Sequence, residues 1–427
     1  MKENKTKPDI RFKGFTEAWE QRKLGDICSE IGDGLHSAPT YDNNGEYYFI
    51  NGNNLVNGHI EIDELETKRV SSYTFASNDK CLDEKTVLLS INGTIGNLAY
   101  YAGEKVMLGK SAAYLKVKDI KKEFLYTSLQ TEMILNNFML SLTGTTIKNL
   151  GLEAIKKTSI LIPGYDEQTK ISKHFNDLDN LITLHQRECD QLKELKKSML
   201  KKMFPRDESS IPEVRFAGFT DAWEQRKLGD SCKINGRIGF RGYTEKDIVT
   251  KKAGGVLTFS PTNIVDNKLT MECKNTYITR EKYDESPEIK ISNGDILFVK
   301  TGSTLGKSAL VTGLKEDASI NPQIVVMRVE KNTETFMSNI LITNGVMKQV
   351  AAVKIGGAVP TMTETELKNF TYFAPAEKEE KKKIGDFFRT LDHLITLHQR
   401  NYNSLNRCKF SKITKNLLIS HMVFIRK

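Results

Sequence analysis

The chain has 427 residues, enough for two or three domains, and a formal net charge of +9 that favours a polyanionic partner. Its six cysteines are scattered without a Cys-x-x-Cys pair, and no stretch reaches the roughly 20 apolar residues of a membrane span. We therefore expect a soluble, cytoplasmic protein with reduced thiols, no metal site and no contact with a membrane.

The chain opens with a motif that returns in its second half. Residues 11–26 recur at 215–230 with two differences, and Leu-Ile-Thr-Leu-His-Gln-Arg stands both at 181–187 and at 394–400. The divergent middles between these matched ends are residues 27–160 and 231–372. A period of about half the chain indicates a tandem domain duplication rather than a solenoid. Matching ends around unlike middles suggest one scaffold that presents two specificities.

Both middles predict mixed strand and helix. Short apolar runs rich in β-branched residues predict strands. These runs are residues 87–91, 113–117, 296–300 and 324–329, and the proline-ended runs 158–163 and 370–375. The segments 124–142 and 335–350 predict helices. Each half is therefore predicted to be an α+β domain followed by a long helix.

The segment after each proline-ended strand has apolar residues that alternate between steps of three and four, as in a coiled coil. The predicted seam residues are Ile171, Phe175, Leu178, Ile182, Leu192, Ile384, Phe388, Leu391, Ile395 and Leu405. The first helix is predicted from about residue 166 to 204, a rod of roughly 55–60 Å. We expect the two helices to pair antiparallel, and His185 and His398 to be polar seam residues rather than catalytic groups.

The second helix departs from this pattern after Leu405. Lys409, Lys412 and Asn416 stand where apolar seam residues are expected. A shifted apolar stripe follows, made of Phe410, Ile413 and Leu417. The pattern leaves open whether the last twenty residues are a frayed end, a partner-binding tail or a degenerate copy of the first helix.

No motif in the chain predicts an active site. Residues 302–308 are similar to a phosphate-binding P-loop but have three residues between the glycines instead of four, and no long helix follows. Asn321-Pro322-Gln323-Ile324 lacks the second proline and the aromatic residue of an adenine methyltransferase motif. We expect a recognition protein that has no catalytic residue.

What remains is a polar, amide-rich surface. Residues 49–58 align with 258–267, and a glycine-rich turn follows a predicted strand in each half. Asn and Gln can read adenine, and Arg and Lys can read guanine or contact phosphates. The predicted DNA-binding residues are Asn53, Asn54, Asn92, Thr94, Lys110, Arg237, Arg241, Lys251, Lys252, Asn263, Lys300, Thr304 and Lys307. The alternative interpretation is an ordinary set of turns with a solvated basic face.

The repeated opening and the repeated Leu-Ile-Thr-Leu-His-Gln-Arg segment make the whole chain resemble the specificity (S) subunit of type I restriction–modification enzymes. The resemblance implies that each divergent middle is a target recognition domain reading one half of a bipartite, asymmetric site in double-stranded DNA. The paired helices would fix the spacer between the half-sites.

The same resemblance implies a set of partner subunits. Two modification subunits would bring S-adenosylmethionine to methylate adenine, and restriction subunits would bring ATP and Mg²⁺ for translocation and cleavage. This chain itself would bind no cofactor.

We therefore predict an α+β protein with two tandem target recognition domains and two long antiparallel coiled-coil helices, related by approximate two-fold symmetry. The predicted segments are domain one at 1–163, a helix at 164–205, a linker at 206–214, domain two at 215–375 and a helix at 376–427. A coiled-coil adaptor without DNA sequence preference is the alternative function, and a tandem P-loop enzyme would need nucleotide binding.

Overall fold

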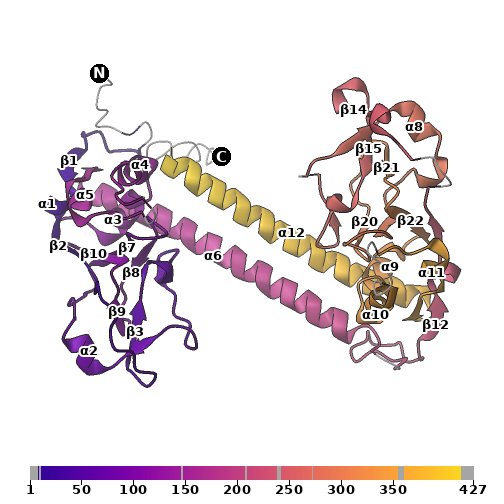
Figure 1. Cartoon of the computed structure of the whole chain (residues 1–427), viewed down its shortest axis with the longest axis horizontal. Helices are drawn as coiled ribbons and strands as arrows, with labels where there is room; N and C mark the ends of the chain where they lie inside the picture. Colours follow the sequence, from indigo (N-terminus) through magenta and orange to yellow (C-terminus); the bar gives the residue numbers. More distant parts are fainter. Residues whose placement is uncertain are drawn as a thin grey trace. The chain divides into compact units, whose positions relative to one another are not determined.

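The computed structural model divides the chain into two compact units. Unit 1 comprises residues 1–186 and 400–427, and unit 2 comprises residues 187–399. Each unit holds one α+β domain and a part of each long helix, which are labelled α6 and α12 in Figure 1. The residues described are 8, 11–145, 148–206, 209–237, 242–271, 273–353 and 360–414, with the side chains of 410–414 excepted.

Unit 1 is built around an antiparallel inner sheet of order β2-β10-β7-β8. Its strands are β2 (Cys28–Asp33), β10 (Ala112–Val117), β7 (Thr86–Ser90) and β8 (Leu98–Tyr100). Strand β7 is buried along its whole length because successive side chains enter different cores. Val87 and Leu89 pack with the helices of the domain, whereas Leu88 packs toward a second sheet.

That second, outer sheet has the order β6-β3-β9. Its strands are β6 (Arg69–Val70), β3 (Tyr47–Ile50) and β9 (Val106–Leu108). Strand β3 runs antiparallel to β6 and parallel to β9. A short 3₁₀ turn, η1 (Gly52–Asn54), follows β3 and leads into the hairpin β4 (Leu55–Val56) and β5 (His59–Ile60).

Unit 2 repeats this plan. Its inner sheet of order β13-β22-β19-β20 comprises β13 (Cys232–Asn235), β22 (Ile324–Val329), β19 (Ile296–Val299) and β20 (Ser308–Leu310). Its outer sheet of order β14-β18-β15-β21 comprises β14 (Ile248–Val249), β18 (Thr276–Ile278), β15 (Val256–Phe259) and β21 (Ala318–Ile320). The parallel pair β15–β21 corresponds to β3–β9, and β14 is an additional edge strand.

The repeated opening is fastened to the start of a long helix in both units. In unit 1, β1 (Glu20–Lys23) pairs with β11 (Ser159–Ile162), the strand before α6. The Arg11 guanidinium donates two hydrogen bonds to the buried Glu167 carboxylate, at 2.8 and 2.6 Å, and the indole N–H of Trp19 donates to the same group at 3.2 Å. The bonded carboxylate raises the pKa of Arg11.

Unit 2 contains the same clamp. Strand β12 (Glu224–Lys227) pairs with β23 (Thr371–Ala374), the strand before α12. Arg215 donates to Glu380 at 2.6 and 2.8 Å, and the Trp223 indole donates to Glu380 at 3.4 Å. Each carboxylate lies in the first turn of its helix, where the helix dipole also favours a negative charge. The repeated sequence therefore fixes where each long helix begins.

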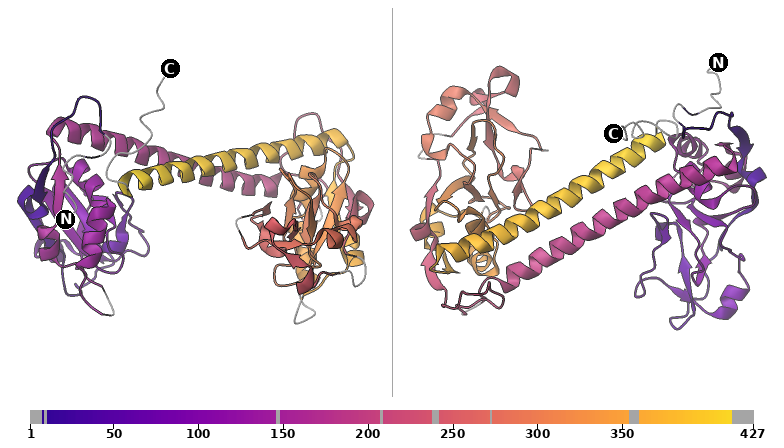
Figure 2. Two further views of the ribbon diagram at one scale, coloured as in Figure 1. Left: turned by 90° about the horizontal axis from the view of Figure 1, so that it is seen from above. Right: turned by 180° about the vertical axis from the view of Figure 1, so that it is seen from behind.

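The long helices are α6 (Tyr165–Lys202) and α12 (Lys378–Thr414). Within unit 2 they run antiparallel, since the Cys189 thiol lies 3.5 Å from the Gln399 amide oxygen and Lys196 lies 2.8 Å from Asp392 (Figure 2). Most predicted seam residues are buried or half-buried in the core of their own unit. Ile171, Phe175 and Leu178, with Leu405, belong to unit 1, and Leu192, Ile384, Phe388, Leu391 and Ile395 belong to unit 2. Ile182 is half-buried.

Polar residues of the seam form matched ion pairs. In unit 2 the Lys196 ammonium lies 2.8 Å from the Asp392 carboxylate, and in unit 1 the Lys409 ammonium lies 2.6 Å from Asp179. Lys409 is thus the counterpart of Lys196, and α12 continues as a helix through it. Lys409 does stand at a seam position, where it forms an ion pair instead of an apolar contact. Lys412 and Asn416 have side chains outside the described residues.

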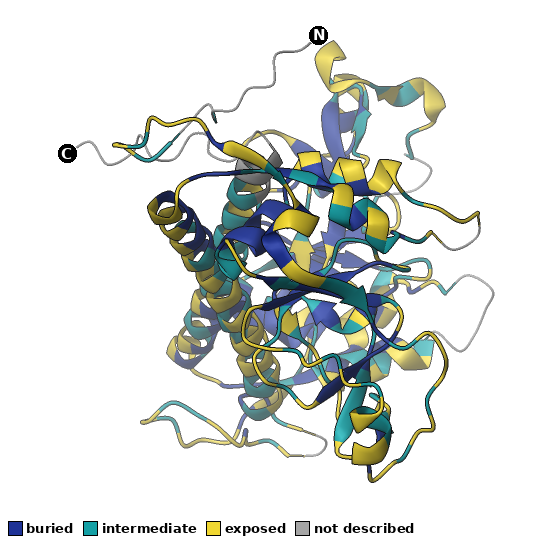
Figure 3. Cartoon of the chain, turned by 90° about the vertical axis from the view of Figure 1, so that its left-hand side faces the viewer, coloured by how far each residue is buried: buried dark blue, intermediate teal, exposed yellow. Residues whose placement is uncertain are grey.

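Two predicted helices are each divided in two. The segment 124–142 forms α3 (Lys122–Leu129) and α4 (Glu132–Leu140), and 335–350 forms α9 (Glu334–Ile340) and α10 (Asn344–Val353). Short helices α5 (Leu152–Lys157) and α11 (Glu364–Asn369) precede the proline-ended strands. Figure 3 shows strands in dark blue and teal, and the outer helical faces largely in yellow. Among the described helices, none has the length and apolar character needed to cross a membrane.

Candidate nucleic-acid interface

Three loops of unit 1 bring predicted DNA-binding residues together where the inner and outer sheets meet. They are the η1 turn, the β7–β8 loop with Asn92, and the β9–β10 turn with Lys110. The Ser111 hydroxyl accepts a hydrogen bond from the Gly52 N–H and donates to the Asn51 side-chain oxygen, both at 2.9 Å. This contact ties the η1 turn to the turn that carries Lys110.

Asn92 and Lys110 line one hollow of about 360 Å³. His36 and Asp33 line the same hollow, and their side chains lie 2.8 Å apart. Sequence reasoning did not single out His36, because nothing local connects it to residues 56 to 74 positions away. Thr94 lies exposed in the same β7–β8 loop, whereas Asn92 is half-buried.

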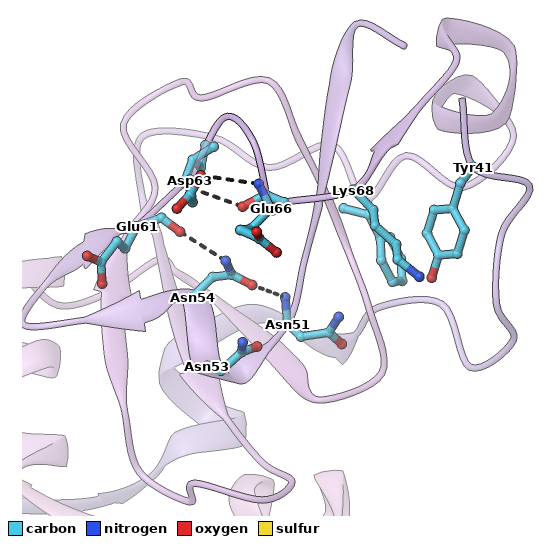
Figure 4. A pocket seen from close by; sticks show the side chains of 11 residues that line it. Tyr41, Asn51, Asn53, Asn54, Glu61, Asp63, Glu66 and Lys68 are labelled. Carbon is cyan, nitrogen blue, oxygen red and sulfur yellow. Dashed lines mark hydrogen bonds between the residues drawn. The ribbon is translucent and has the colours of Figure 1, made fainter. Parts of the chain in front are cut away.

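A second hollow of about 820 Å³ adjoins the η1 turn (Figure 4). Asn51, Asn53 and Asn54 line it from the turn, and Tyr41 lines it from a separate segment of the chain. The segment after β5 adds the acidic residues Glu61, Asp63 and Glu66 together with Lys68. The Lys68 ammonium lies 4.4 Å from the centre of the Tyr41 ring, a cation–π contact.

Unit 2 contains the corresponding three loops. Asn321 and Gln323 occupy the β21–β22 turn, where the Asn321 side-chain oxygen accepts from the Gln323 N–H at 3.0 Å. The Asn-Pro-Gln-Ile segment is therefore a connecting turn between strands. Its place in the sheet is that of the β9–β10 turn, so Pro322 stands where unit 1 has Lys110.

Residues 302–307 of this segment lie in the loop between β19 and β20. Gly302 and Gly306 have φ angles of +104° and +92°, which glycine adopts without steric cost. Strand β20 begins at Ser308, so the loop has no helix N-terminus behind it to bind a phosphate. Lys307 is exposed in this loop and Thr304 is half-buried.

Other predicted DNA-binding residues of unit 2 have contacts within the protein. Lys251 forms an ion pair with Glu316 at 2.9 Å, and the Lys300 ammonium lies 3.4 Å from Glu364. Lys252 is exposed. Arg241 lies outside the described residues.

Arg237 is half-buried at the end of the inner sheet. Its guanidinium donates to the Ile320 carbonyl at 3.3 Å and to the Ser319 hydroxyl at 3.4 Å. It also lies 5.5 Å from the centre of the Tyr243 ring, and burial lowers the pKa of Arg237.

Asn263 differs from the other predicted residues in its burial. Its side chain is fully buried, and its amide group donates to the Thr270 carbonyl at 3.1 Å and to the Asn275 side chain at 2.8 Å. A side chain in this position holds the loop together. Asn54, its half-buried counterpart, donates to the Glu61 carbonyl at 2.9 Å.

The cysteines at matched positions, Cys28 and Cys232, are buried in the cores of their units. Burial raises the pKa of both thiols to about 12, which keeps them protonated at neutral pH. A thiol in that state is a poor nucleophile. Their place is at the start of the inner sheet in each copy of the scaffold.

Taken together, the duplicated scaffold with polar loops at its sheet junctions is that of a recognition protein. Comparison with protein families matches the description "Type I restriction modification DNA specificity domain" twice, at residues 16–194 and 220–407. The chain belongs to this family and is a DNA-recognition specificity subunit, which has no catalytic role of its own.

Relatives extend over nearly the whole chain. The type I restriction enzyme MjaVIII specificity subunit of Methanocaldococcus jannaschii is 22% identical over 96% of this chain and 94% of its own length. The putative MjaX specificity subunit of the same organism is also 22% identical, over 96% and 95%. The crystal structure of an S subunit from M. genitalium shares the fold, with a TM-score of 0.62, 13% identity and coverage of 97% and 99%.

Proposed function

We propose that each α+β domain reads one half of a bipartite, asymmetric site in double-stranded DNA. The domain in residues 1–163 would read one half-site, and the domain in residues 215–375 would read the other. The observation that supports this is one scaffold with unlike loops: the clamp, the inner sheet and the η1-type turn recur, while the junction carries Lys110 in one unit and Pro322 in the other.

The residues proposed to contact DNA are those on the junction loops and the basic edge of unit 2. They are Asn53, Asn92, Thr94, Lys110, Arg237, Lys252, Thr304 and Lys307. Exposed lysines there would contact phosphates and give a steep salt dependence of affinity. Lys251 and Lys300 would have to leave their carboxylate partners, Glu316 and Glu364, before they could contact DNA.

The test is single-molecule sequencing of adenine methylation in cells that express this chain with its modification subunit. We expect a bipartite methylated motif that is absent without the chain. Exchange of residues 27–160 for those of another family member should change one half-site only. A chimera that altered both half-sites would contradict the modular assignment, and no motif at all would contradict the function.

The long helices are proposed to set the spacer between the half-sites. In support, α6 continues without a break through 38 residues, about 57 Å at 1.5 Å per residue. Insertion of four residues after both Arg187 and Arg400, at matched places in the repeat, adds about 6 Å to each helix. Because each base pair adds about 3.4 Å along the duplex, the spacer between the half-sites should lengthen by about one to two base pairs. Insertion after Arg187 alone is the control, because it shifts the helix register.

Two modification subunits are proposed to dock on the repeated surfaces of this chain and to bring S-adenosylmethionine. Restriction subunits would supply ATP and Mg²⁺, and this chain would bind none of these cofactors. In support, Leu184 and Leu397 occupy the same place in the repeated heptapeptide and are 48% and 43% exposed. Such leucines do not contribute to the cores of their own units and are available to a partner.

Native mass spectrometry of the purified complex tests this stoichiometry. Leu184→Glu and Leu397→Glu should each remove one modification subunit, and the double variant should remove both. Leu65→Glu is the matched control, because Leu65 is 95% exposed and lies outside the repeat. Retention of both subunits by the double variant would show that they dock elsewhere.

A further inference from the structure

The η1 turn of unit 1 has a structural counterpart in unit 2, the 3₁₀ turn η4 (Pro261–Asn263). In each turn the last residue is an asparagine whose side-chain oxygen accepts the N–H of the residue three positions earlier. These are Asn54 with Asn51 and Asn263 with Ser260, both at 2.9 Å.

The same asparagines tie each turn to the hairpin that follows. Asn54 donates to the Glu61 carbonyl and Asn263 to the Thr270 carbonyl, at 2.9 and 3.1 Å. The hairpin turns use left-handed residues in both units, at Asn57 with φ of 49° and at Asp266 with φ of 49°. Two loops of different sequence therefore share a backbone conformation at these residues and these two internal hydrogen bonds.

The middle residue of each turn can differ without disturbing this frame. Asn53 and Thr262 are both exposed, and their neighbours Asn54 and Asn263 are held by the bonds above. Within the described part of the chain, the Asn53 amide has no hydrogen-bond partner, and it lines the larger hollow (Figure 4). The Thr262 hydroxyl lies 2.7 Å from the Ser260 hydroxyl.

We propose that Asn53 and Thr262 are specificity-determining residues, each reading a base-pair edge in the half-site of its own unit. The inference rests on the proposed function and names residues that carry it out. An asparagine amide can donate to N7 and accept from the N6 amino group of adenine, so Asn53 selects an A·T pair. A threonine offers one hydroxyl and a methyl group, so Thr262 discriminates less by hydrogen bonding and contacts a thymine methyl group.

The experiment exchanges the two residues in the full chain, assembled with its modification subunit. Asn53→Thr and Thr262→Asn are compared with the unaltered chain by methylation sequencing and by selection from DNA randomised in one half-site. Asn57→Gly is the control, because glycine accepts its left-handed backbone and the residue is exposed on the same hairpin.

Asn53→Thr should relax one A·T position in a single half-site, with a loss of discrimination of about 5- to 150-fold there. Thr262→Asn should create an adenine preference at one position of the other half-site. If the unaltered chain gives a bipartite motif and both variants give the same motif, the inference is overturned while the proposed function stands. Changes at several positions, or in both half-sites, would also overturn it. Absence of a motif with the unaltered chain overturns both.

Discussion

The inner and outer layers of the two domains differ in how closely they repeat. Both inner sheets have four strands in the same order, and both clamps use an arginine, a tryptophan and a buried glutamate. The outer sheets have three strands in unit 1 and four in unit 2. The additional strand β14 lies at the edge of its sheet, beside β18.

This difference shows where the scaffold tolerates change. An edge strand pairs on one side only. Strand β14 can therefore be present in one domain and absent from the other without altering the parallel pair β15–β21 in the same sheet. The residues between β5 and β6 differ too, with four acidic residues at 61–66 of unit 1. The difference in strand number lies at the edge of the outer sheet, whereas the inner sheets, packed on both faces in unit 1, keep the same strand order.

The largest expected effect comes from breaking one clamp at a time. Glu167→Ala should destabilise unit 1 and Glu380→Ala unit 2, by about 3–5 kcal/mol each, because each leaves a largely buried arginine without its partner. The chain has two tryptophans, one in each unit. Urea unfolding followed by fluorescence in a Trp223→Phe background reports unit 1, and a Trp19→Phe background reports unit 2. Losses of clearly different size in the two units would show that the clamps are not equivalent, and a loss that one substitution spreads over both units would show that the units do not unfold separately.

A smaller and unequal effect is expected at the two turn asparagines. Asn263→Ala should cost about 2–3 kcal/mol, because a fully buried amide leaves several partners unsatisfied. Asn54→Ala, at a half-buried position with fewer bonds, should cost about 1 kcal/mol. Hydrogen exchange measures the two turns separately. The N–H groups of residues 260 and 270 report the turn of Asn263, and those of residues 51 and 61 report the turn of Asn54. Equal losses would contradict the difference in burial.

The smallest effect is expected at the ion pairs between the long helices. Lys409→Ala should destabilise unit 1 by about 1 kcal/mol, since Asp179 loses its ammonium partner at 2.6 Å. Lys196→Ala should cost less in unit 2, because Asp392 keeps Lys268 at 3.4 Å. Thermal unfolding with the same single-tryptophan backgrounds compares them. The exchange Lys409→Asp with Asp179→Lys should recover part of the loss, and no recovery would show that the charges do not interact.

Much of the fold could be predicted because its signals are periodic or repeated. The predicted runs 113–117 and 324–329 coincide with β10 and β22 to within one residue, and the seam pattern located α6 and α12. The Lys409–Asp179 pair was missed although Lys196 and Asp392 occupy equivalent places in the repeat. The signal was present, but it requires comparing pairs of residues about 200 positions apart.

The outer sheets and the roles of individual loop residues could not be predicted. Strands β3 and β9 pair in parallel although more than fifty residues separate them in the sequence. Packing determines this pairing, and no local sequence pattern indicates it. Asn53 and Asn54 are neighbours of the same type, and only burial and hydrogen bonding separate an exposed amide from one that holds the turn. The sequence alone also did not show that Asn263 is buried and bonded within its loop.

The division of the chain has a consequence for its biosynthesis. Unit 2 is one continuous segment of the chain. Unit 1 also includes residues 400–414 of α12, which pack against α6. A ribosome delivers domains from the N-terminus onward, at about 5–20 residues per second. The N-terminal domain is therefore synthesised first but receives its last segment after unit 2. For about 10–40 seconds, the apolar surface around Phe175 and Leu178 lacks the residues of α12 that cover it. A chaperone that holds this surface during translation would act on unit 1 and not on unit 2.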